Sequence, residues 1–259
     1  MEEVVLYEKT EEIGKITINR PQKHNSIDLN TLKRLIEVFK QSAKNADICV
    51  IFTSEGKDFS VGDDLKYTYD LLLQVEKLPE AIEFLNSYQI LTRSMLAHPG
   101  VIIAGIKGWC IGGAFEMTLS CDLRIAADDT KIMTPEVGIG MVCTNASTFL
   151  LPRIIGEGKA KELMYLGKEL NAEEAYKLGL VNEVCKPQGL NRILKLTANS
   201  IVQKDHEALR MTKKLINERM ESYIEAALDG EVVSLIKLGQ SEGLRKRLEK
   251  FVKKNDFKQ

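Results

Sequence analysis

The sequence lacks the features that direct a protein to a membrane, to secretion or to a nucleic acid. Its first residues, MEEVVLYEKTEE, do not have the basic and then apolar pattern of a secretory signal peptide. No apolar run approaches the roughly twenty residues that span a bilayer. The formal net charge at pH 7 is only −1, which gives no sign of a polyanionic partner. We therefore expect a cytoplasmic protein with neither a membrane nor a nucleic-acid partner.

Cysteine and histidine are also scarce. The five cysteines are odd in number, widely spaced and mostly inside apolar runs, which predicts reduced, buried thiols rather than a disulfide or zinc framework. The three histidines stand in unrelated contexts, and none is placed beside a nucleophile. We therefore expect no metal site and no serine or cysteine triad.

No linker rich in Gly, Pro or Ser divides the chain, and no internal repeat is visible. With 259 residues, 44% hydrophobic and 28% charged, the chain has an ordinary globular composition and can bury a substantial core. The hydrophobic period changes repeatedly from that of a strand to that of a helix, which predicts an α/β protein.

Individual elements follow from this periodicity. We predict a hairpin of strands 4–7 and 15–18 around Gly14, and a buried strand at 48–53. Asp28 is expected to cap an amphipathic helix that ends at residue 45. The other predicted helical segments are 67–97, broken at Pro79, and then 190–203, 206–227, 232–238 and 244–253.

The stretch GWCIGGAFE at 108–116 is the most informative part of the chain. It follows a strand-like run at 101–107 and leads into a helix-compatible run, so its glycines present N–H groups at a helix N-terminus, where negative charge is favoured. Gly112 and Gly113 allow a ligand to approach the backbone, and Glu116 lies in the first helical turn. A glutamate beside such a site favours proton transfer at a carbonyl compound. The alternative is a plain strand-to-helix turn whose acidic residue complements the helix dipole.

Three further segments add to this pattern. They are NRPQKHNSI at 19–27, DFSVGDDLK at 58–66 and PEVGIG at 135–140. In this order and spacing the four segments closely resemble the crotonase superfamily, also called the enoyl-CoA hydratase/isomerase family. The resemblance extends from about residue 4 to residue 184, with a weaker echo in the C-terminal helices.

The resemblance implies an α/β fold with a spiral core of ββα repeats, followed by a helical trimerisation region. It divides the chain into a core with an acyl-CoA site at 1–190 and a helical oligomerisation region at 191–259. A homotrimer or a hexamer, built as a dimer of trimers, is the expected assembly.

In this family two backbone N–H groups stabilise an enolate-like oxygen at the carbonyl of an acyl-CoA thioester. The resemblance assigns these donors to Asp63 and Gly113, with Gly112 beside them. Asp63 departs from the family pattern, in which a small apolar residue is common. Its carboxylate would repel the developing oxyanion unless it points away or is paired.

The resemblance also implies contacts with CoA. Asp64 and Leu65 keep the family pattern, and Lys66 is placed for the CoA phosphates or the pantetheine arm. Lys250, in the basic C-terminal segment, is a candidate for the adenine and phosphates, although a solvated helical face, which needs no ligand, is the favoured interpretation of that segment. CoA arrives as part of the substrate, so no separate cofactor is expected.

Glu116 and Glu136 match the two carboxylates of the family's hydratases. There one glutamate removes a proton from water while the other supplies the proton at the α-carbon of a trans-2-enoyl-CoA, giving syn addition. Two close carboxyls in a partly dry pocket separate their pKa values, which allows one to be ionised and the other protonated. The pair therefore favours an enoyl-CoA hydratase, a lyase of fatty acid metabolism.

Other functions stay open. Within the superfamily the alternatives are an enoyl-CoA isomerase, a ring-cleaving hydrolase and a thioesterase, and outside catalysis an RNA-binding or scaffold homologue. The loop MVCTNASTF at 141–149 departs from the family's Gly-Gly-Thr pattern. Its polar residues have three interpretations: they orient water, they bind a polar or cyclic acyl group, or Asn145 caps the next helix.

Overall fold

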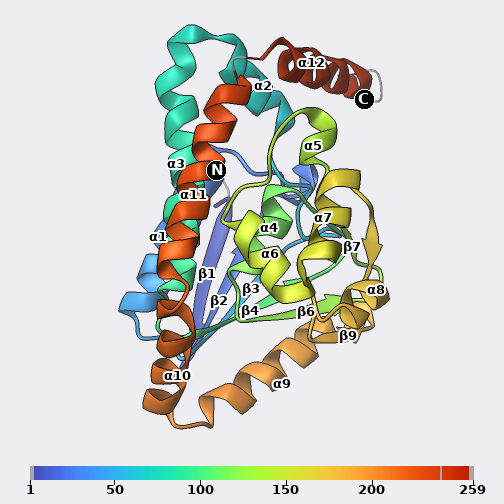
Figure 1. Ribbon diagram of the computed structural model, residues 1–259. Coiled ribbons are helices and arrows are strands. Elements are labelled where there is room, and N and C mark those ends of the chain that lie inside the picture. The colour runs from blue at the N-terminus through green and yellow to red at the C-terminus, as the bar shows by residue number, and fades with distance from the viewer. Residues whose placement is uncertain (1–2, 240, 257–259) are drawn as a thin grey trace.

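The structure is a computed structural model that describes residues 3–239 and 241–256. Figure 1 shows its elements in chain order. The strands are β1 (Val5–Thr10), β2 (Ile13–Ile18), β3 (Cys49–Ser54), β4 (Val101–Ile106), β5 (Trp109–Ile111), β6 (Leu123–Ala127), β7 (Lys131–Met133), β8 (Leu170–Asn171) and β9 (Glu183–Cys185). The α-helices are α1 (Leu29–Lys44), α2 (Leu65–Leu73), α3 (Leu78–Leu96), α4 (Gly113–Leu119), α5 (Glu136–Ile139), α6 (Ser147–Ile155), α7 (Glu157–Leu166), α8 (Ala172–Lys177), α9 (Leu190–Val202), α10 (His206–Glu218), α11 (Glu221–Gly239) and α12 (Glu242–Asp256).

Within the described residues the strands form two sheets. The larger has the order β1-β2-β3-β4-β6-β9; β1 is antiparallel to β2, and the other neighbouring pairs are parallel. The smaller has the order β5-β7-β8. Two consecutive segments share a strand–strand–helix order. In the first, β4 lies in the large sheet, β5 lies in the small sheet and α4 follows; in the second, β6 lies in the large sheet, β7 lies in the small sheet and α5 follows. The predicted α/β fold with ββα repeats is therefore confirmed.

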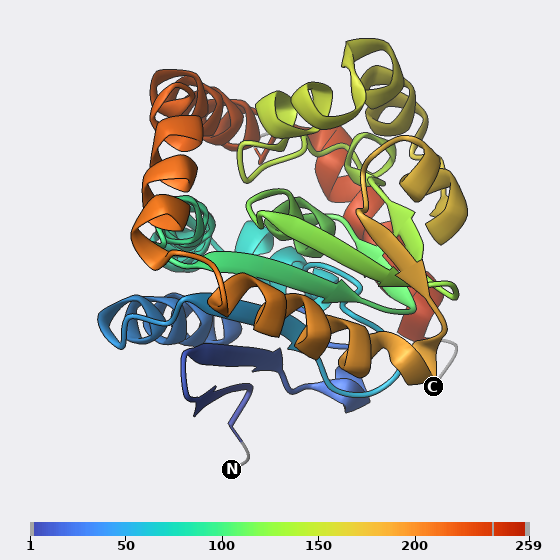
Figure 2. The same cartoon turned by 90° about the horizontal axis from the view of Figure 1, so that it is seen from below.

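The large sheet is buried on both faces because its strands alternate between two cores. In β3, Val50 and Phe52 join the main core, whereas Cys49 and Ile51 face a second core. The second core is completed by α9 through Leu190, Leu194 and Ala198, and Figure 2 shows α9 running across this face of the sheet. This period-2 alternation is typical of a covered parallel sheet.

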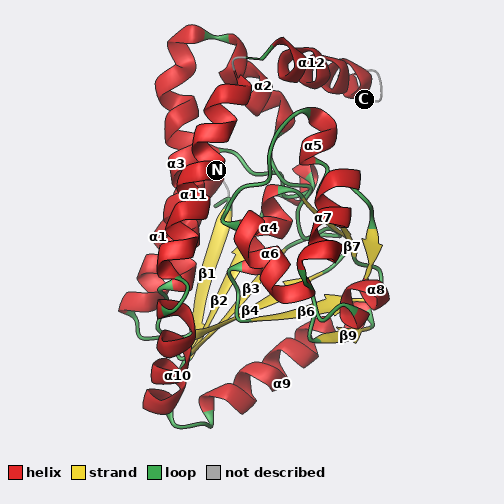
Figure 3. Ribbon diagram, viewed as in Figure 1, coloured by secondary structure: helices red, strands yellow, loops and turns green. Residues whose placement is uncertain are grey.

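Helices cover the outside of the molecule, and the strands gather inside it (Figure 3). The long helices α3 and α11 lie side by side, joined by the hydrogen bond from Gln89 to the carbonyl of Leu228 and by the ion pair of Arg93 with Glu225. The last helix, α12, packs on α2. Among the described residues no helix combines the length and apolarity needed to cross a membrane.

Several predicted elements are confirmed, and two details in the first hundred residues are wrong. Asp28 caps α1 by accepting from the N–H of Thr31, as expected. The first hairpin turns at residues 11–12 rather than at Gly14, which lies within β2 where a Cβ would collide with the carboxylate of Asp47. The segment before α3 is broken by a 3₁₀ turn, η2 (Val75–Lys77), and Pro79 instead occupies the first turn of α3, where proline is tolerated.

The predicted helix 206–227 is also wrong. The chain breaks after α10 and restarts as α11, which continues through Gly230 to residue 239. The boundary between the two predicted regions, at residues 190 and 191, falls inside α9, which packs on the sheet. The division into a core and an oligomerisation region stays a prediction.

Candidate active site

The glycine turn before α4 has the geometry that its sequence predicts. Gly112 adopts φ +54° as the N-cap of α4, and its N–H donates to the carbonyl of Met133 at 3.0 Å. Gly113 is the first residue of the helix, so its N–H has no acceptor inside the helix. Within this motif the structure adds β5, a short strand that the sequence analysis did not predict.

The turn around Gly62 lies directly against this one. The Ser60 N–H donates to the carbonyl of Trp109 at 2.9 Å, and the Ile111 N–H donates to the carbonyl of Ser60 at 3.0 Å. Gly62, at φ +81°, packs so closely that a Cβ would lie 2.7 Å from the oxygen of Ile111 and 3.6 Å from the nitrogen of Gly113. In the part of the chain that the structure describes, no hydrogen bond occupies the N–H of Asp63 or of Gly113. Two unused donors from different turns thus adjoin each other.

The carboxyl of Asp63 is paired. The hydroxyl of Tyr88 on α3 donates to Asp63 Oδ1. A Cβ on Gly113 would lie 3.1 Å from this oxygen and 2.9 Å from the hydroxyl, so the pair borders the turn. Burial raises the pKa of Asp63 to about 6, while the hydrogen bond from Tyr88 acts in the opposite direction. The sequence indicated that the Asp63 carboxylate would repel an oxyanion unless it points away or is paired, and the structure pairs it with Tyr88.

The two predicted glutamates meet in the interior. Glu116 is 1% exposed and Glu136 is 8% exposed. One carboxylate oxygen of each and the thiol sulfur of Cys143 lie within 4.8 Å of one another. Residues twenty positions apart in sequence therefore form one buried cluster. Carboxylate and thiolate ligands can hold a metal ion, so the expectation of no metal site stays a prediction.

Glu116 is held by the loop that follows α5. It accepts hydrogen bonds from the N–H of Thr144 at 2.9 Å, from Thr144 Oγ1 at 2.7 Å, from Asn145 Nδ2 at 3.0 Å and from Ser147 Oγ at 3.4 Å. These four donors fix the position of the carboxyl group. They also favour its ionised form, because each donates to oxygen.

Glu136 has a different environment. It begins α5, directly after Pro135, and its Oε1 lies over Gly112, where a Cβ would be 2.6 Å away. The thiol of Cys143 donates to Glu136 Oε2 at 3.6 Å, within the longer range of sulfur hydrogen bonds. Burial raises the pKa of Cys143 so far that the thiol remains a neutral donor. The carboxyl group of Glu136 therefore accepts fewer side-chain and loop hydrogen bonds than that of Glu116.

Both carboxyls resist ionisation. Burial raises the pKa of Glu136 to about 7. Burial, and then the charge of Glu136, raise the pKa of Glu116 well above its usual value, while its hydrogen bonds with Thr144 act in the opposite direction. Two carboxyls this close do not both ionise readily, so the pair retains a proton near neutral pH. The donors around Glu116 favour Glu136 as the protonated partner.

The other candidate CoA-binding residues lie in α2, at its N-cap and on α12. Asp64 caps α2, accepting from the N–H of Tyr67 at 3.3 Å, and lies 3.6 Å from Lys23 Nζ. Leu65 is half-buried and Lys66 is exposed in the first turn of α2. Lys250 is exposed on α12, the helix that packs on α2. Their roles in binding stay predictions.

The structure adds three residues that the sequence did not single out: Tyr88, Cys143 and Glu231. Tyr88 stands in a segment that was only described as helical, and Glu231 lies in α11, far along the chain. The prediction that Asn145 caps the next helix is wrong, because its amide binds Glu116 and the N-cap of α6 is Ala146. The only signal for Cys143 was its place in the divergent 141–149 loop.

A small cavity adjoins the cluster between α3 and α11. Its volume is about 10 Å³, room for about one water molecule. It is lined by the polar residues Tyr88, Gln89, Thr144, Asn145 and Glu231 and by the apolar residues Leu85, Leu228, Val232 and Leu235.

Comparison with known proteins identifies the family. A model of the enoyl-CoA hydratase/isomerase family matches residues 8–259. The chain belongs to this family. Among family members, the crotonyl-CoA hydratase of Syntrophomonas wolfei is 34% identical over 256 residues, which cover 96% of each chain. The short-chain-enoyl-CoA hydratase of Clostridium acetobutylicum is 31% identical, over 96% of this chain and 95% of its own.

Solved structures of the family share the fold. The crystal structure of an enoyl-CoA hydratase from Bacillus halodurans superposes with a TM-score of 0.89 at 28% identity, covering 95% of this chain and 99% of its own. The crotonase fold, with its spiral core, is thus shown over nearly the whole chain.

Proposed function

We propose that the protein is an enoyl-CoA hydratase that adds water reversibly to a trans-2-enoyl-CoA. The observation that carries this proposal is the buried pair Glu116 and Glu136, with carboxylate oxygens within 4.8 Å, beside the unused N–H groups of Asp63 and Gly113. Membership of the family and the names of the relatives support it.

The N–H groups of Asp63 and Gly113 bind the thioester oxygen of the substrate. Negative charge develops on this oxygen as water adds to the conjugated double bond, and fixed donors stabilise that charge more than they stabilise the ground state. The N-terminus of α4 adds a favourable dipole. Loss of one such donor costs about a hundredfold to a thousandfold in rate.

The two glutamates divide the proton transfers. Glu116, whose ionised form is favoured by four donors, removes a proton from water as the oxygen bonds to the β-carbon. Protonated Glu136 delivers a proton to the α-carbon as the enolate collapses. Transfer of a proton between the two carboxyls then restores the starting state. Water is the only co-reactant, and no electron is exchanged.

The remaining proposals concern CoA binding and assembly. Asp64, Leu65, Lys66 and Gly112 are proposed to contact CoA, with Lys66 placed for the phosphates or the pantetheine arm, and Lys250 is proposed to contact the adenine and phosphates. CoA is part of the substrate, so hydration requires no other cofactor. A homotrimer or a hexamer in the cytoplasm is the proposed assembly and location.

A four-carbon acyl group is the proposed substrate class. The names of the two relatives, a crotonyl-CoA hydratase and a short-chain-enoyl-CoA hydratase, support this size. Crotonyl-CoA is therefore the substrate for the first assay.

Isomerisation of an enoyl-CoA is the second candidate. It is favoured by the contrast between the carboxyls, because Glu116 is occupied by four loop donors whereas a single thiol donates to Glu136. One carboxyl suffices to move a proton between the α- and γ-carbons. Isomerisation would then survive Glu116→Gln, whereas hydration would not.

The test follows loss of the conjugated thioester absorbance of crotonyl-CoA and identifies the 3-hydroxyacyl product. We expect turnover by the wild type and losses of about a hundredfold or more in both Glu116→Gln and Glu136→Gln, as for essential acid/base groups. Glu157→Gln, at an exposed glutamate of α7, is the matched control and should keep full activity. A folded wild type that leaves crotonyl-CoA unchanged would rule out the proposed reaction on this substrate.

A further inference from the structure

Helix α6 begins without a cap of its own. Its N-cap is Ala146, at φ +57°, whose methyl side chain accepts no hydrogen bond. The first N–H groups of a helix have no acceptor inside it, so a buried start of this kind requires an acceptor from elsewhere. The preceding Asn145, the residue type that would usually cap, has turned its amide towards Glu116.

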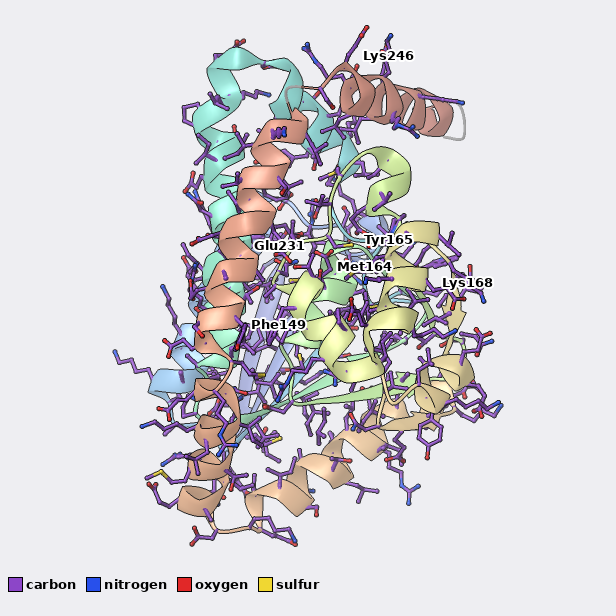
Figure 4. All side chains as sticks on the ribbon, in the orientation of Figure 1. Phe149, Met164, Tyr165, Lys168, Glu231 and Lys246 are labelled. Atoms are coloured by element: carbon purple, nitrogen blue, oxygen red, sulfur yellow. The ribbon has the colours of Figure 1, made fainter. Side chains whose placement is uncertain are left out.

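Glu231 of α11 supplies the missing acceptor. Its carboxylate accepts from the N–H of Ala146 at 2.9 Å, from the N–H of Thr148 at 3.1 Å and from Thr148 Oγ1 at 2.6 Å. The residue is 5% exposed and lies on the side of α11 that faces α6 (Figure 4). Burial raises the pKa of Glu231, while the bonds from Thr148 and Ala146 act against that rise.

The segment that Glu231 holds is the same one that holds Glu116. The donors to Glu116 come from Thr144, Asn145 and Ser147, and the donors to Glu231 come from Ala146 and Thr148. Successive residues thus bind two carboxylates from opposite sides. Asn145 and Ala146 both have positive φ, at 60° and 57°, a conformation that costs free energy in residues other than glycine. Bonds on both sides offset that cost.

We propose that Glu231 is a positioning residue that holds residues 144–148 in the conformation in which they orient Glu116. The proposal rests on the proposed hydration for its kinetic consequence, but the structural link does not depend on the reaction. Glu231 touches neither substrate nor reacting atoms in this role. It acts through the loop, so the C-terminal helix α11 contributes to the acid/base site.

The charge of Glu231 adds a second, electrostatic effect. It is one of the groups that raise the pKa of Glu116. The titratable groups that interact with Glu116 from neighbouring elements are Glu136 on α5, Cys143 in the following loop, Tyr88 on α3 and Glu231 on α11. Removal of the negative charge of Glu231 should therefore lower the pKa of Glu116.

Glu231→Gln is the decisive variant because it keeps the shape of the side chain. Its amide offers one oxygen acceptor where the carboxylate offered two, so the N–H of Ala146 or of Thr148 loses its partner. We expect kcat with crotonyl-CoA to fall tenfold to a hundredfold, since a displacement of about 1 Å at a catalytic group costs up to about a hundredfold. KM should change less than twofold, and the ascending limb of the pH–kcat profile should move to lower pH. Glu231→Ala should lose more activity than Glu231→Gln.

Hydrogen exchange separates positioning from capping alone. Whether Glu231 positions the loop or only caps α6, its loss exposes the amides of Ala146 and Thr148 to exchange. Faster exchange at the amide of Thr144, which donates to Glu116 and not to Glu231, is expected only if the loop transmits the change. Asp229→Asn, at an exposed aspartate of the same helix, removes the same charge and should leave kcat and exchange unchanged.

Two results would overturn the proposal. One is a folded Glu231→Gln protein with the kcat and pH profile of the wild type. The other is unchanged exchange at Thr144 while Ala146 and Thr148 exchange faster, which assigns Glu231 to capping alone. If the wild type does not hydrate crotonyl-CoA, the proposed function fails separately, and exchange at Thr144 then decides for or against positioning.

Discussion

The carboxyl group of Glu136 lies directly over Gly112, so that a Cβ on this glycine would be 2.6 Å from Oε1. The two residues come from different ββα repeats, at the starts of α5 and α4. The absence of a side chain at 112 is therefore what lets the proposed acid approach the N–H groups of the oxyanion site.

Gly112→Ala should disable the site. The new methyl group would collide with Glu136, and the residue would have to keep φ +54°, which L-residues rarely adopt. We expect about a hundredfold loss of kcat/KM from displacement of the carboxyl group, and about 1–3 kcal/mol lower free energy of unfolding from backbone strain. Crotonyl-CoA turnover and urea unfolding measure the two effects.

Gly158→Ala is the control for that substitution. Gly158 lies in α7, and a Cβ there meets nothing within 4 Å. Alanine is a better helix former than glycine, so the free energy of unfolding should rise by up to about 1 kcal/mol, with unchanged activity. Full activity of Gly112→Ala would contradict the placement of Glu136.

Tyr88→Phe should destabilise the protein at alkaline pH more than at acid pH. The hydroxyl donates to the ionised Asp63, and its loss leaves that buried carboxylate without this donor, at a cost of about 1–3 kcal/mol. Below the pKa of Asp63, about 6, the carboxyl is protonated and the cost fades. Urea unfolding at pH 5 and pH 8 measures the difference. Tyr223→Phe, at a hydroxyl-bearing ring that is 63% exposed, should show no such dependence.

Asp63→Asn should flatten the pH dependence of stability. Burial raises the pKa of Asp63 from 3.8 to about 6 in the folded protein, so the folded state binds more protons than the unfolded state between these values. The contribution of Asp63 to the free energy of unfolding therefore falls as pH rises from 4 to 6. At 1.36 kcal/mol for each pKa unit, this group contributes at most about 3 kcal/mol to that fall. Equal slopes in wild type and Asp63→Asn would show that the group is solvated in the folded state.

A thiol titration should find a single accessible cysteine. Cys185 is half-buried, whereas Cys49, Cys110, Cys121 and Cys143 are buried. Burial also raises the pKa of these thiols, which suppresses the reactive thiolate. With a disulfide reagent at pH 8, we expect one fast thiol per native chain and all five after unfolding. Cys185→Ser should remove the fast phase; rapid labelling that instead inactivates the enzyme would place Cys143 within reach of solvent.

The sequence predicted secondary structure best where the hydrophobic pattern of a single segment is sufficient to identify the element. The helix capped by Asp28 and the buried strand at 49–54 lie within a residue or so of their predicted bounds because an amphipathic or fully apolar run leaves few alternatives. The C-terminal helices were less predictable. Gly230 is a poor helix former, yet α11 passes through it because Leu228, Glu231 and Leu235 pack against the rest of the protein.

The residues of the site were predicted where a local sequence pattern marks them, and missed where none does. Gly112 and Gly113 carry a strong local signal, and Glu116 follows them within one helical turn. Tyr88 and Glu231 carry none, because a tyrosine and a glutamate are ordinary residues of amphipathic helices. Only the packing of α3 and α11 against the loop brings them to Asp63 and to α6.

The sequence by itself determined the α/β class, the glycine turn that opens α4, and the two glutamates with their family. These features depend on backbone conformation and on residue type, which a short stretch of sequence specifies. Tertiary structure alone decided that Asp63 is paired with Tyr88, that the 144–147 loop binds Glu116, and that Glu231 caps α6 in place of Asn145. Hydrogen bonds between residues up to 85 positions apart depend on how separate elements pack, and no local pattern records that packing.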